Sequence, residues 1–151
     1  MNVVGVVGES DAGKTTLIER LVPALGEYGS VGTVKGIHHD VELDTEGKDT
    51  HRHRTAGADR VVGVTPHLTA SFRPVGKADG GEETALERAL AEFEDADFVV
   101  VEGFGGSPHP KILVGEGADD REFAGDVLAR VPSGGAADVE ALVAWIRARE
   151  D

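Results

Sequence analysis

The phosphate-binding pattern G-x-x-x-x-G-K-[ST] is met at every fixed position by Gly8-Glu9-Ser10-Asp11-Ala12-Gly13-Lys14-Thr15. Glycines at the first and sixth positions of the pattern let backbone N–H groups turn inward around a phosphate chain. Lys14 offers a mobile ammonium to the β and γ phosphates. The hydroxyl of Thr15 suits Mg²⁺, and that of Thr16 suits an α-phosphate. We therefore predict that residues 8–16 hold a nucleoside triphosphate with Mg²⁺.

A carboxylate, Glu102, ends the second strongly apolar run of the chain, Phe98-Val99-Val100-Val101. Ligands of parallel α/β sheets gather at the carboxyl ends of the strands, so we expect Glu102 beside the phosphate loop. Two roles stay open for it, holding Mg²⁺ through water or orienting an attacking water. The alternative is a solvated acid at a strand end.

Further acids follow the second expected strand, at Asp40, Asp44 and Asp49. Nucleotide-bound Mg²⁺ usually takes one or two protein carboxylates. We choose Asp49 as the candidate second ligand and catalytic acid, because it lies at an expected helix start. Asp40 and Asp44 are more typical of a solvated acidic loop.

The same region holds His38, His39, His51 and His53. Histidines and carboxylates together can bind a transition metal, but His51 and His53 point to different sides of a helix. We therefore favour polar contacts of His38 and His39 to phosphate or to a partner.

Two lysines also merit attention. Lys35 ends the second expected strand and can point into the phosphate crevice, and Lys111 begins a later strand after Pro108-His109-Pro110. An ordinary exposed surface lysine is the alternative for each. Nothing in the spacing of the chain selects GTP over ATP.

Composition limits the classes of partner. Asp and Glu number 28 against 15 Lys and Arg, a formal charge of −13, which disfavours binding to duplex nucleic acid. Excess acid with few lysines also suggests a surface adapted to high salt. No apolar run approaches the roughly 20 residues that span a bilayer, and neither a secretory signal nor a cysteine is present. We expect a cytoplasmic protein without membrane contact.

Apolar periodicity predicts the elements that position these residues. Helices are expected over 15–27, 82–94 and 137–149. A short helix capped by Asp49 or Thr50 is expected to run to residue 56. Pro23 should kink the first helix or end its regular part. Strands are expected over 2–7, 30–35, 59–65, 67–73, 96–101, 111–114 and 126–131. This alternation predicts an α/β fold of the P-loop NTPase type: a mainly parallel sheet flanked by helices, with a β-hairpin near 59–73. Residues 1–151 are expected to form a single P-loop NTP-binding domain.

The order of several segments resembles the molybdopterin-guanine dinucleotide biosynthesis protein B (MobB) family. These segments are GESDAGKTT, VKGIHHDVELDTEGKDT, TAGADRVV, VVVEGFG and PKILV. The resemblance implies a homodimeric GTP-binding protein with Mg²⁺ and slow GTP hydrolysis. It also implies a role in attaching GMP to molybdopterin, beside a MobA-type nucleotidyltransferase and near a MoeA-type protein. By this resemblance, residues Gly8 to Thr16 would bind phosphates, and Thr15 with Asp49 or Glu102 would bind Mg²⁺. His38, His39 and Asp40 match the family's histidine-rich loop.

The chain departs from this family at three places. Gly36 stands where a histidine is usual, Gly105 replaces a lysine, and Gly115-Glu116 follows Val114 where an arginine is common. The loss of basic groups puts phosphate or molybdopterin contacts at that rim in doubt.

Two other functions remain open. A small-molecule kinase using ATP would need lid arginines, for which Arg52, Arg54 and Arg60 are the candidates. A metallochaperone GTPase would use the histidines.

Overall fold

A parallel sheet forms the centre of the computed structural model, which describes residues 1–117, 119 and 122–149. Its strand order is β2-β5-β1-β6-β7, and all neighbours pair in parallel. The bounds are Asn2–Gly8 for β1, Val31–Lys35 for β2, Phe98–Glu102 for β5, Lys111–Val114 for β6 and Val127–Val131 for β7. The predicted parallel α/β sheet is confirmed, with strand ends shifted by a few residues.

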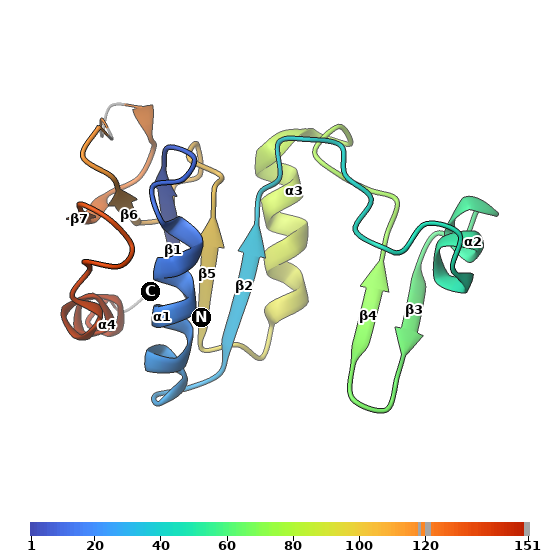
Figure 1. The fold of residues 1–151 in the computed structure, drawn as a ribbon, viewed down its shortest axis with the longest axis horizontal. Coiled ribbons are helices and arrows are strands. Elements are labelled where there is room, and N and C mark those ends of the chain that lie inside the picture. The colour runs from blue at the N-terminus through green and yellow to red at the C-terminus, as the bar shows by residue number, and fades with distance from the viewer. Residues whose placement is uncertain (118, 120–121, 150–151) are drawn as a thin grey trace.

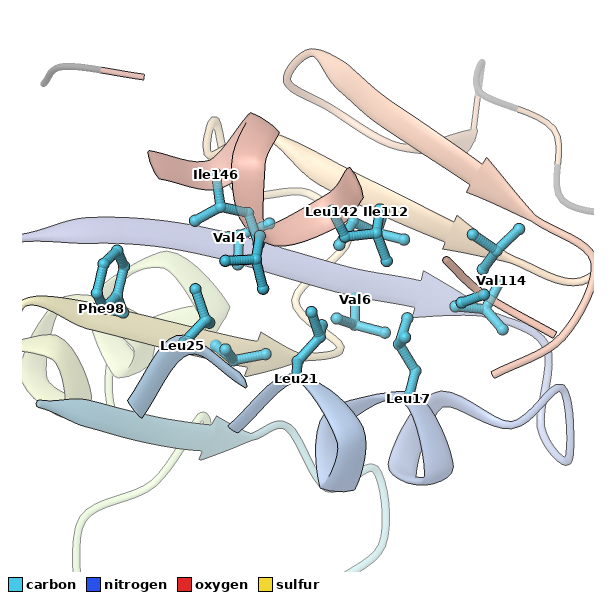
Figure 2. Packing of buried hydrophobic residues seen from close by; sticks show 14 residues of the cluster. Val4, Val6, Leu17, Leu21, Leu25, Phe98, Ile112, Val114, Leu142 and Ile146 are labelled. Carbon is cyan, nitrogen blue, oxygen red and sulfur yellow. The ribbon is translucent and has the colours of Figure 1, made fainter. Parts of the chain in front are cut away.

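Helices α1 (Lys14–Gly26) and α4 (Val139–Arg147) cover one face of this sheet. Leu17, Leu21 and Leu25 follow a helical spacing and are fully buried against the sheet (Figure 2). Pro23 does not end the helix, which continues to Gly26. Because Pro23 lies on the exposed side, the backbone carbonyl that loses its helical partner there faces water.

The opposite face carries helix α3 (Gly81–Leu90) and the 3₁₀ turn η1 (Ala91–Phe93). Leu86 of α3 packs with Val99, Val101 and Phe104 in a second, smaller apolar cluster. The single helix predicted over 82–94 is therefore an α-helix whose last turn tightens. None of the helices in the described ranges is long and apolar enough to cross a membrane.

Residues 49–73 form an arm beyond the β2 edge of the sheet (Figure 1). The arm consists of α2 (Asp49–Thr55) and an antiparallel hairpin of β3 (Val61–Val64) and β4 (Thr69–Phe72). The hairpin is as predicted, with shorter strands. Glu92 of η1 ties it to the main body, since one carboxylate oxygen lies 3.0 Å from both Arg60 and Arg73.

The predicted cap of α2 is wrong. Asp49 is the first helical residue, Lys48 takes the cap position, and no side chain caps the helix. The Thr50 hydroxyl instead donates a hydrogen bond to the Asp44 carboxylate at 2.7 Å. A tertiary contact to the preceding loop thus replaces the local capping bond that the sequence suggested.

Candidate functional site

The loop between β1 and α1 is shaped by glycines at its two ends. Gly8 has φ +151°, and a Cβ there would overlap the carbonyl oxygen of Val114 on the neighbouring strand. Gly13 has φ +95°, and a Cβ there would lie 2.9 Å from the backbone nitrogen of Gly134. A side chain fits at neither place, so the two fixed glycines of the motif are required by the backbone. Asp11 between them also has a positive φ, 63°.

The ammonium of Lys14 lies folded over this loop. Its Nζ donates hydrogen bonds to the carbonyl oxygens of Gly8 at 2.8 Å and Glu9 at 2.7 Å. The opening of α1 adds partial positive charge from its unpaired N–H groups. Lys14 and these N–H groups therefore supply positive charge for a phosphate chain, beside the acids Glu9 and Asp11 of the same loop.

Thr15 and Glu102 meet across the carboxyl ends of the strands. The Thr15 hydroxyl donates to the two Glu102 carboxylate oxygens, at 3.1 and 3.3 Å. Lys35, paired in register with Glu102 on the adjacent strand, places its Nζ 3.5 Å from the same carboxylate. A hydroxyl and a carboxylate are the hard oxygen donors that Mg²⁺ prefers, so this pair fits that ion.

Two connected hollows open at this edge. A cradle of about 310 Å³ is lined by Asp11, Gly13, Lys14, Thr15, Thr16 and Glu102. A larger hollow of about 500 Å³, here called the side pocket, shares Asp11, Lys14, Thr15 and Glu102 with it. Its other walls include Ser10, Lys35, His38, His39, Phe104 and Phe123. The structure thus gathers at one edge the predicted site residues Ser10, Asp11, Gly13 to Thr16, Lys35, His38, His39 and Glu102.

The structure does not bring Asp49 to this site. Asp49 opens α2 in the arm and lines neither the cradle nor the side pocket, within the part of the chain that the structure describes (Figure 1). The helix begins within a residue or two of the predicted position, but it packs with the hairpin and not with the sheet.

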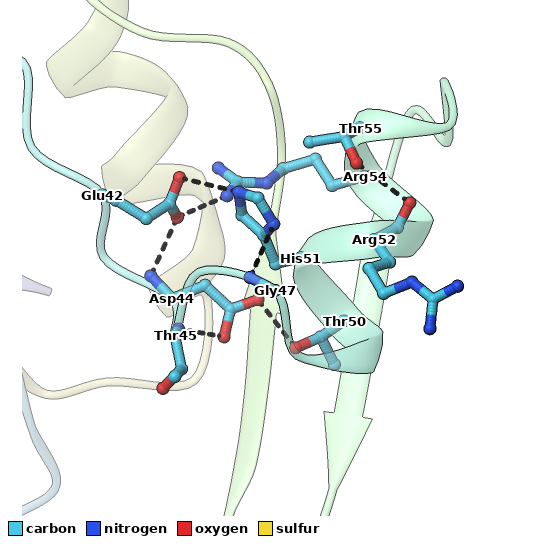
Figure 3. Close-up of polar contacts among 9 residues, drawn as sticks. All are labelled: Glu42, Asp44, Thr45, Gly47, Thr50, His51, Arg52, Arg54 and Thr55. Atoms are coloured by element: carbon cyan, nitrogen blue, oxygen red, sulfur yellow. Dashed lines mark hydrogen bonds and ion pairs between the residues drawn. The ribbon is translucent and has the colours of Figure 1, made fainter.

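The acids before α2 anchor the 40–48 loop to that helix, as Figure 3 shows. Glu42 accepts hydrogen bonds from the backbone N–H of Asp44 and from Arg54, and these lower its pKa. The Thr50 hydroxyl lowers the pKa of Asp44 in the same way. His51 accepts from the Gly47 N–H at 3.2 Å. Among residues 1–117, 119 and 122–149, no group of three or more His, Asp and Glu side chains could hold a metal.

Sequence reasoning missed the burial of Lys111. Its side chain is 1% exposed, and Nζ donates to the Ser107 carbonyl, the Ser107 hydroxyl and the His109 carbonyl. Burial lowers the pKa of this lysine. Its stem lies against Gly5 of β1, where an added Cβ would come 3.0 Å from Cγ. The sequence clue is that Lys111 opens the apolar strand KILV directly after Pro108-His109-Pro110.

Known proteins resemble this chain along most of its length. The sequence model of molybdopterin guanine dinucleotide synthesis protein B (MobB) matches residues 3–128. A molybdopterin-guanine dinucleotide biosynthesis adapter protein of Haemophilus influenzae is 35% identical over 74% of this chain and 62% of its own length. A probable adapter protein of Bacillus subtilis is 36% identical over 80% of this chain and 68% of its own length.

A crystal structure described as molybdopterin-guanine biosynthesis protein B superposes with a TM-score of 0.70 and 29% identity. The match covers 96% of each chain. The fold, the loop at residues 8–16 and the extent of the sequence match agree with one another. The chain therefore belongs to the MobB family.

Proposed function

We propose that the protein binds GTP with Mg²⁺, hydrolyses it slowly, and acts as an adapter in the formation of molybdopterin guanine dinucleotide. The observation that carries this proposal is the glycine-shaped loop with Lys14 over it and Thr15 against Glu102. The relatives named above are described as adapter proteins of molybdopterin-guanine dinucleotide biosynthesis. The chain spans about 62% of the first of these relatives, so its activity, substrate and partners are all part of the proposal.

Each polar group has a separate task in this proposal. The two carbonyl oxygens that now hold Lys14 are weaker partners than phosphate oxygens, so the ammonium would exchange them for the β and γ phosphates. Thr15 and Glu102 would hold Mg²⁺, which supplies positive charge to the phosphates when bound. Backbone N–H groups of 8–16 would surround the phosphate chain.

We expect slow hydrolysis because of the side chains that line the site. No arginine lines the cradle or the side pocket in the described part of the chain. Phosphoryl-transfer enzymes commonly use such an arginine to stabilise transition-state charge, at about 10³–10⁵ in rate. We therefore expect a low intrinsic rate, increased only if a partner contributes a cation.

The arrangement of the arm argues against an ATP-dependent small-molecule kinase. Arg54 pairs with Glu42 of the preceding loop and Arg60 pairs with Glu92 of η1, so two of the three candidate lid arginines already fix the arm in place. A metallochaperone GTPase would need a metal site, and the described residues do not bring three metal-binding side chains together. We therefore favour the adapter.

A second copy of the chain is the first partner that we propose. Val62, Val64 and Leu68 of the hairpin are 55%, 75% and 66% exposed. Val62 and Val64 lie on the same face of β3, because side chains alternate along a strand. Apolar side chains exposed together on one face are typical of protein interfaces. Other partners would be a MobA-type nucleotidyltransferase, a MoeA-type protein and molybdopterin or its guanine dinucleotide, all in the cytoplasm.

Nucleotide choice is tested by thermal unfolding in high salt with GTP or ATP, each with MgCl₂ or EDTA. A ligand at 100 times its Kd adds about 2.7 kcal/mol of stability. We expect stabilisation by GTP with MgCl₂ and little by ATP. Stabilisation by ATP alone, together with phosphate transfer to a small acceptor, would support the kinase instead.

A further inference from the structure

We propose that a groove along helix α3, here called the α3 groove, binds a basic amphipathic helix of a partner protein. The groove lies between α3 with η1 on one side and residues 104–109, which follow strand β5, on the other. It adds an interface that contains no residue of the phosphate loop or of the hairpin. The inference goes beyond the proposed function and does not depend on nucleotide binding.

Two overlapping hollows make up the α3 groove. One has a volume of about 270 Å³ and shares Glu82 and Phe104 with the side pocket. The other has a volume of about 530 Å³, shares Glu83 and Leu86 with the first, and is bounded by Met1 just before β1. The groove therefore runs beside α3 from the carboxyl ends of the strands toward their amino ends.

Apolar side chains form the floor of the larger hollow. Leu86 and Leu90 are four residues apart on α3, so they lie on the same side of that helix. Leu86 is buried and Leu90 is half-buried, whereas Ala91 and Pro108 beside them are exposed. Apolar groups that stay open to solvent in one groove are typical of a surface that binds another protein.

The wall opposite α3 is held in place by the buried Lys111. Its Nζ donates hydrogen bonds to the carbonyl and the hydroxyl of Ser107 and to the carbonyl of His109. Ser107 and His109 both line the larger hollow. Because this wall is fixed in the free protein, a partner loses less conformational freedom of the chain when it binds.

Three glutamates of the groove have no cationic partner. Glu83, Glu87 and Glu94 are exposed and line the larger hollow. Within the described residues none of them forms an ion pair, whereas Glu82 in the smaller hollow is paired with Lys77 at 2.9 Å. The acidic stretch of the groove is therefore the part that holds the apolar floor.

The positive groups of the larger hollow are fewer. In the part of the chain that the structure describes, these are the α-amino group of Met1 and the imidazole of His109. Three carboxylates thus face one ammonium when the histidine is neutral. A partner surface with lysines or arginines beside an apolar face would match both the charge and the floor.

The walls of the groove favour a helix as the occupant. No strand residue lines either hollow in the described ranges, so the groove offers no sheet edge to which an extended peptide could add. Helix α3 has 10 residues and is about 15 Å long, which gives room for about three turns of a second helix. Such a helix places apolar residues spaced i, i+3 or i+4, and i+7 into a groove of this kind.

The charge of the chain argues against a second copy of it as the occupant. Each copy has 28 acidic residues against 15 lysines and arginines. A second copy would bring more negative charge to the three glutamates, and like charges repel. The fitting occupant is therefore a different protein with a basic segment.

The test uses a fluorescein-labelled helical peptide of about three to four turns, with leucines on one face and lysines on the others. One control peptide has glutamates in place of the lysines, and a second has the same composition in an order that forms no apolar face. Binding to the full chain is measured by fluorescence anisotropy at fixed salt, without nucleotide. We expect the basic amphipathic peptide to bind roughly 10-fold or more tightly than either control.

Each control peptide can contradict one part of the proposal. Equal binding of the reordered peptide would overturn the apolar floor, and equal binding of the acidic peptide would overturn the basic class of partner. If none of the peptides binds, the α3 groove is not a docking site.

Two triple variants separate the groove from the overall charge of the chain. The first removes the three groove carboxylates by Glu83→Gln, Glu87→Gln and Glu94→Gln. The matched control makes the same change in net charge at exposed glutamates that line neither hollow: Glu19→Gln, Glu27→Gln and Glu140→Gln. We expect the first to weaken the basic peptide roughly 10-fold and the control to weaken it by about twofold or less. Equal weakening would mean that the peptide is attracted by net charge alone, which contradicts the groove.

Ala91→Arg tests the floor itself. Ala91 is exposed and lines the larger hollow, so a long cationic side chain there would fill part of the groove and pair with its glutamates. We expect roughly 10-fold weaker peptide binding, with the urea midpoint and the GTP affinity near those of wild type. Unchanged peptide binding would contradict the proposed place of docking. A shift of the protein from dimer to monomer on Ala91→Arg, seen by light scattering, would show that a second copy covers the groove and would overturn the basic partner.

Discussion

Replacing Lys111 tests whether a buried ammonium holds the 107–110 loop against the sheet. In Lys111→Ala the methylenes Cγ, Cδ and Cε are lost from a fully buried stem. At about 0.8 kcal/mol per buried CH₂ this amounts to roughly 2 kcal/mol. The carbonyls of Ser107 and His109 also lose their hydrogen-bond donor. Each carbonyl that water does not reach then lowers the folding stability by about 1–3 kcal/mol. With one of the two carbonyls left without a partner and the other reached by water, we expect a total loss of about 3–5 kcal/mol, within the range for large-to-small core changes.

Lys111→Met separates the stem from the charge. Methionine fills most of the same space, and it no longer buries a charge whose acceptors in the described part of the chain are neutral oxygens. The Met variant should therefore be about 2 kcal/mol more stable than the Ala variant. Urea unfolding at fixed salt, with unchanged m-value, measures both. Equal stability of the Met and Ala variants, or an Ala variant within 1 kcal/mol of wild type, would refute the packing described for Lys111.

The pH dependence gives a second check on the same residue. Burial lowers the pKa of Lys111 below its usual value of 10.5, so the unfolded chain binds this proton more tightly than the folded chain. Folding stability then rises with pH between the lowered pKa and 10.5. The difference between wild type and Lys111→Met should grow in favour of wild type across that window. A constant difference would show that the folded protein carries no destabilised ammonium.

Three further results are expected. Glu102→Gln should weaken GTP binding roughly 10-fold in MgCl₂ and leave it unchanged in EDTA, because the lost charge acts through the ion; calorimetry that found equal losses in both would exclude this role. The pKa of Asp97 is lowered by hydrogen bonds from the Ser30 N–H and hydroxyl, so its contribution to stability is present above pH 3.8 and is lost as the pH falls through the lowered pKa. Asp97→Asn should flatten that acid dependence in urea unfolding, and an unchanged profile would contradict it. Val64→Asp should shift the protein toward monomer in light scattering at fixed concentration, whereas an unaltered mass would argue against the hairpin as interface.

Much of the sheet could be predicted from the sequence because its signals are local. Apolar runs mark β1 and β5, the first of them broken by Gly5, and the helical spacing of Leu17, Leu21 and Leu25 marks the buried side of α1. The motif and the strand-end rule together predicted that Thr15 and Glu102 lie close together. Each of these inferences needs only residues near one another in the chain, or one general rule of parallel sheets.

What could not be predicted depends on contacts between distant segments. Asp49 was predicted as a metal ligand because it stands at a helix start, but the position of α2 is set by the hairpin and by Arg54 pairing with Glu42. Lys111 could not be distinguished from a surface lysine in the sequence. Its hydrogen-bond acceptors are mainly backbone carbonyls, which every residue has, so no residue type marks them. The position of the Phe104 ring depends on the absence of a side chain at Gly36, which is far away in the sequence.

The most direct test of the central claim is a GTP titration of wild type and Lys14→Ala in MgCl₂, with Lys48→Ala as the matched control. Lys14 donates to two loop carbonyls here and would transfer to phosphate oxygens, where a charged hydrogen bond contributes about 1.5–3 kcal/mol. We predict that Lys14→Ala weakens GTP binding by roughly 10- to 100-fold while its urea midpoint stays near that of wild type. A folded Lys14→Ala protein that binds GTP as tightly as wild type would contradict the assignment of residues 8–16 as the phosphate site.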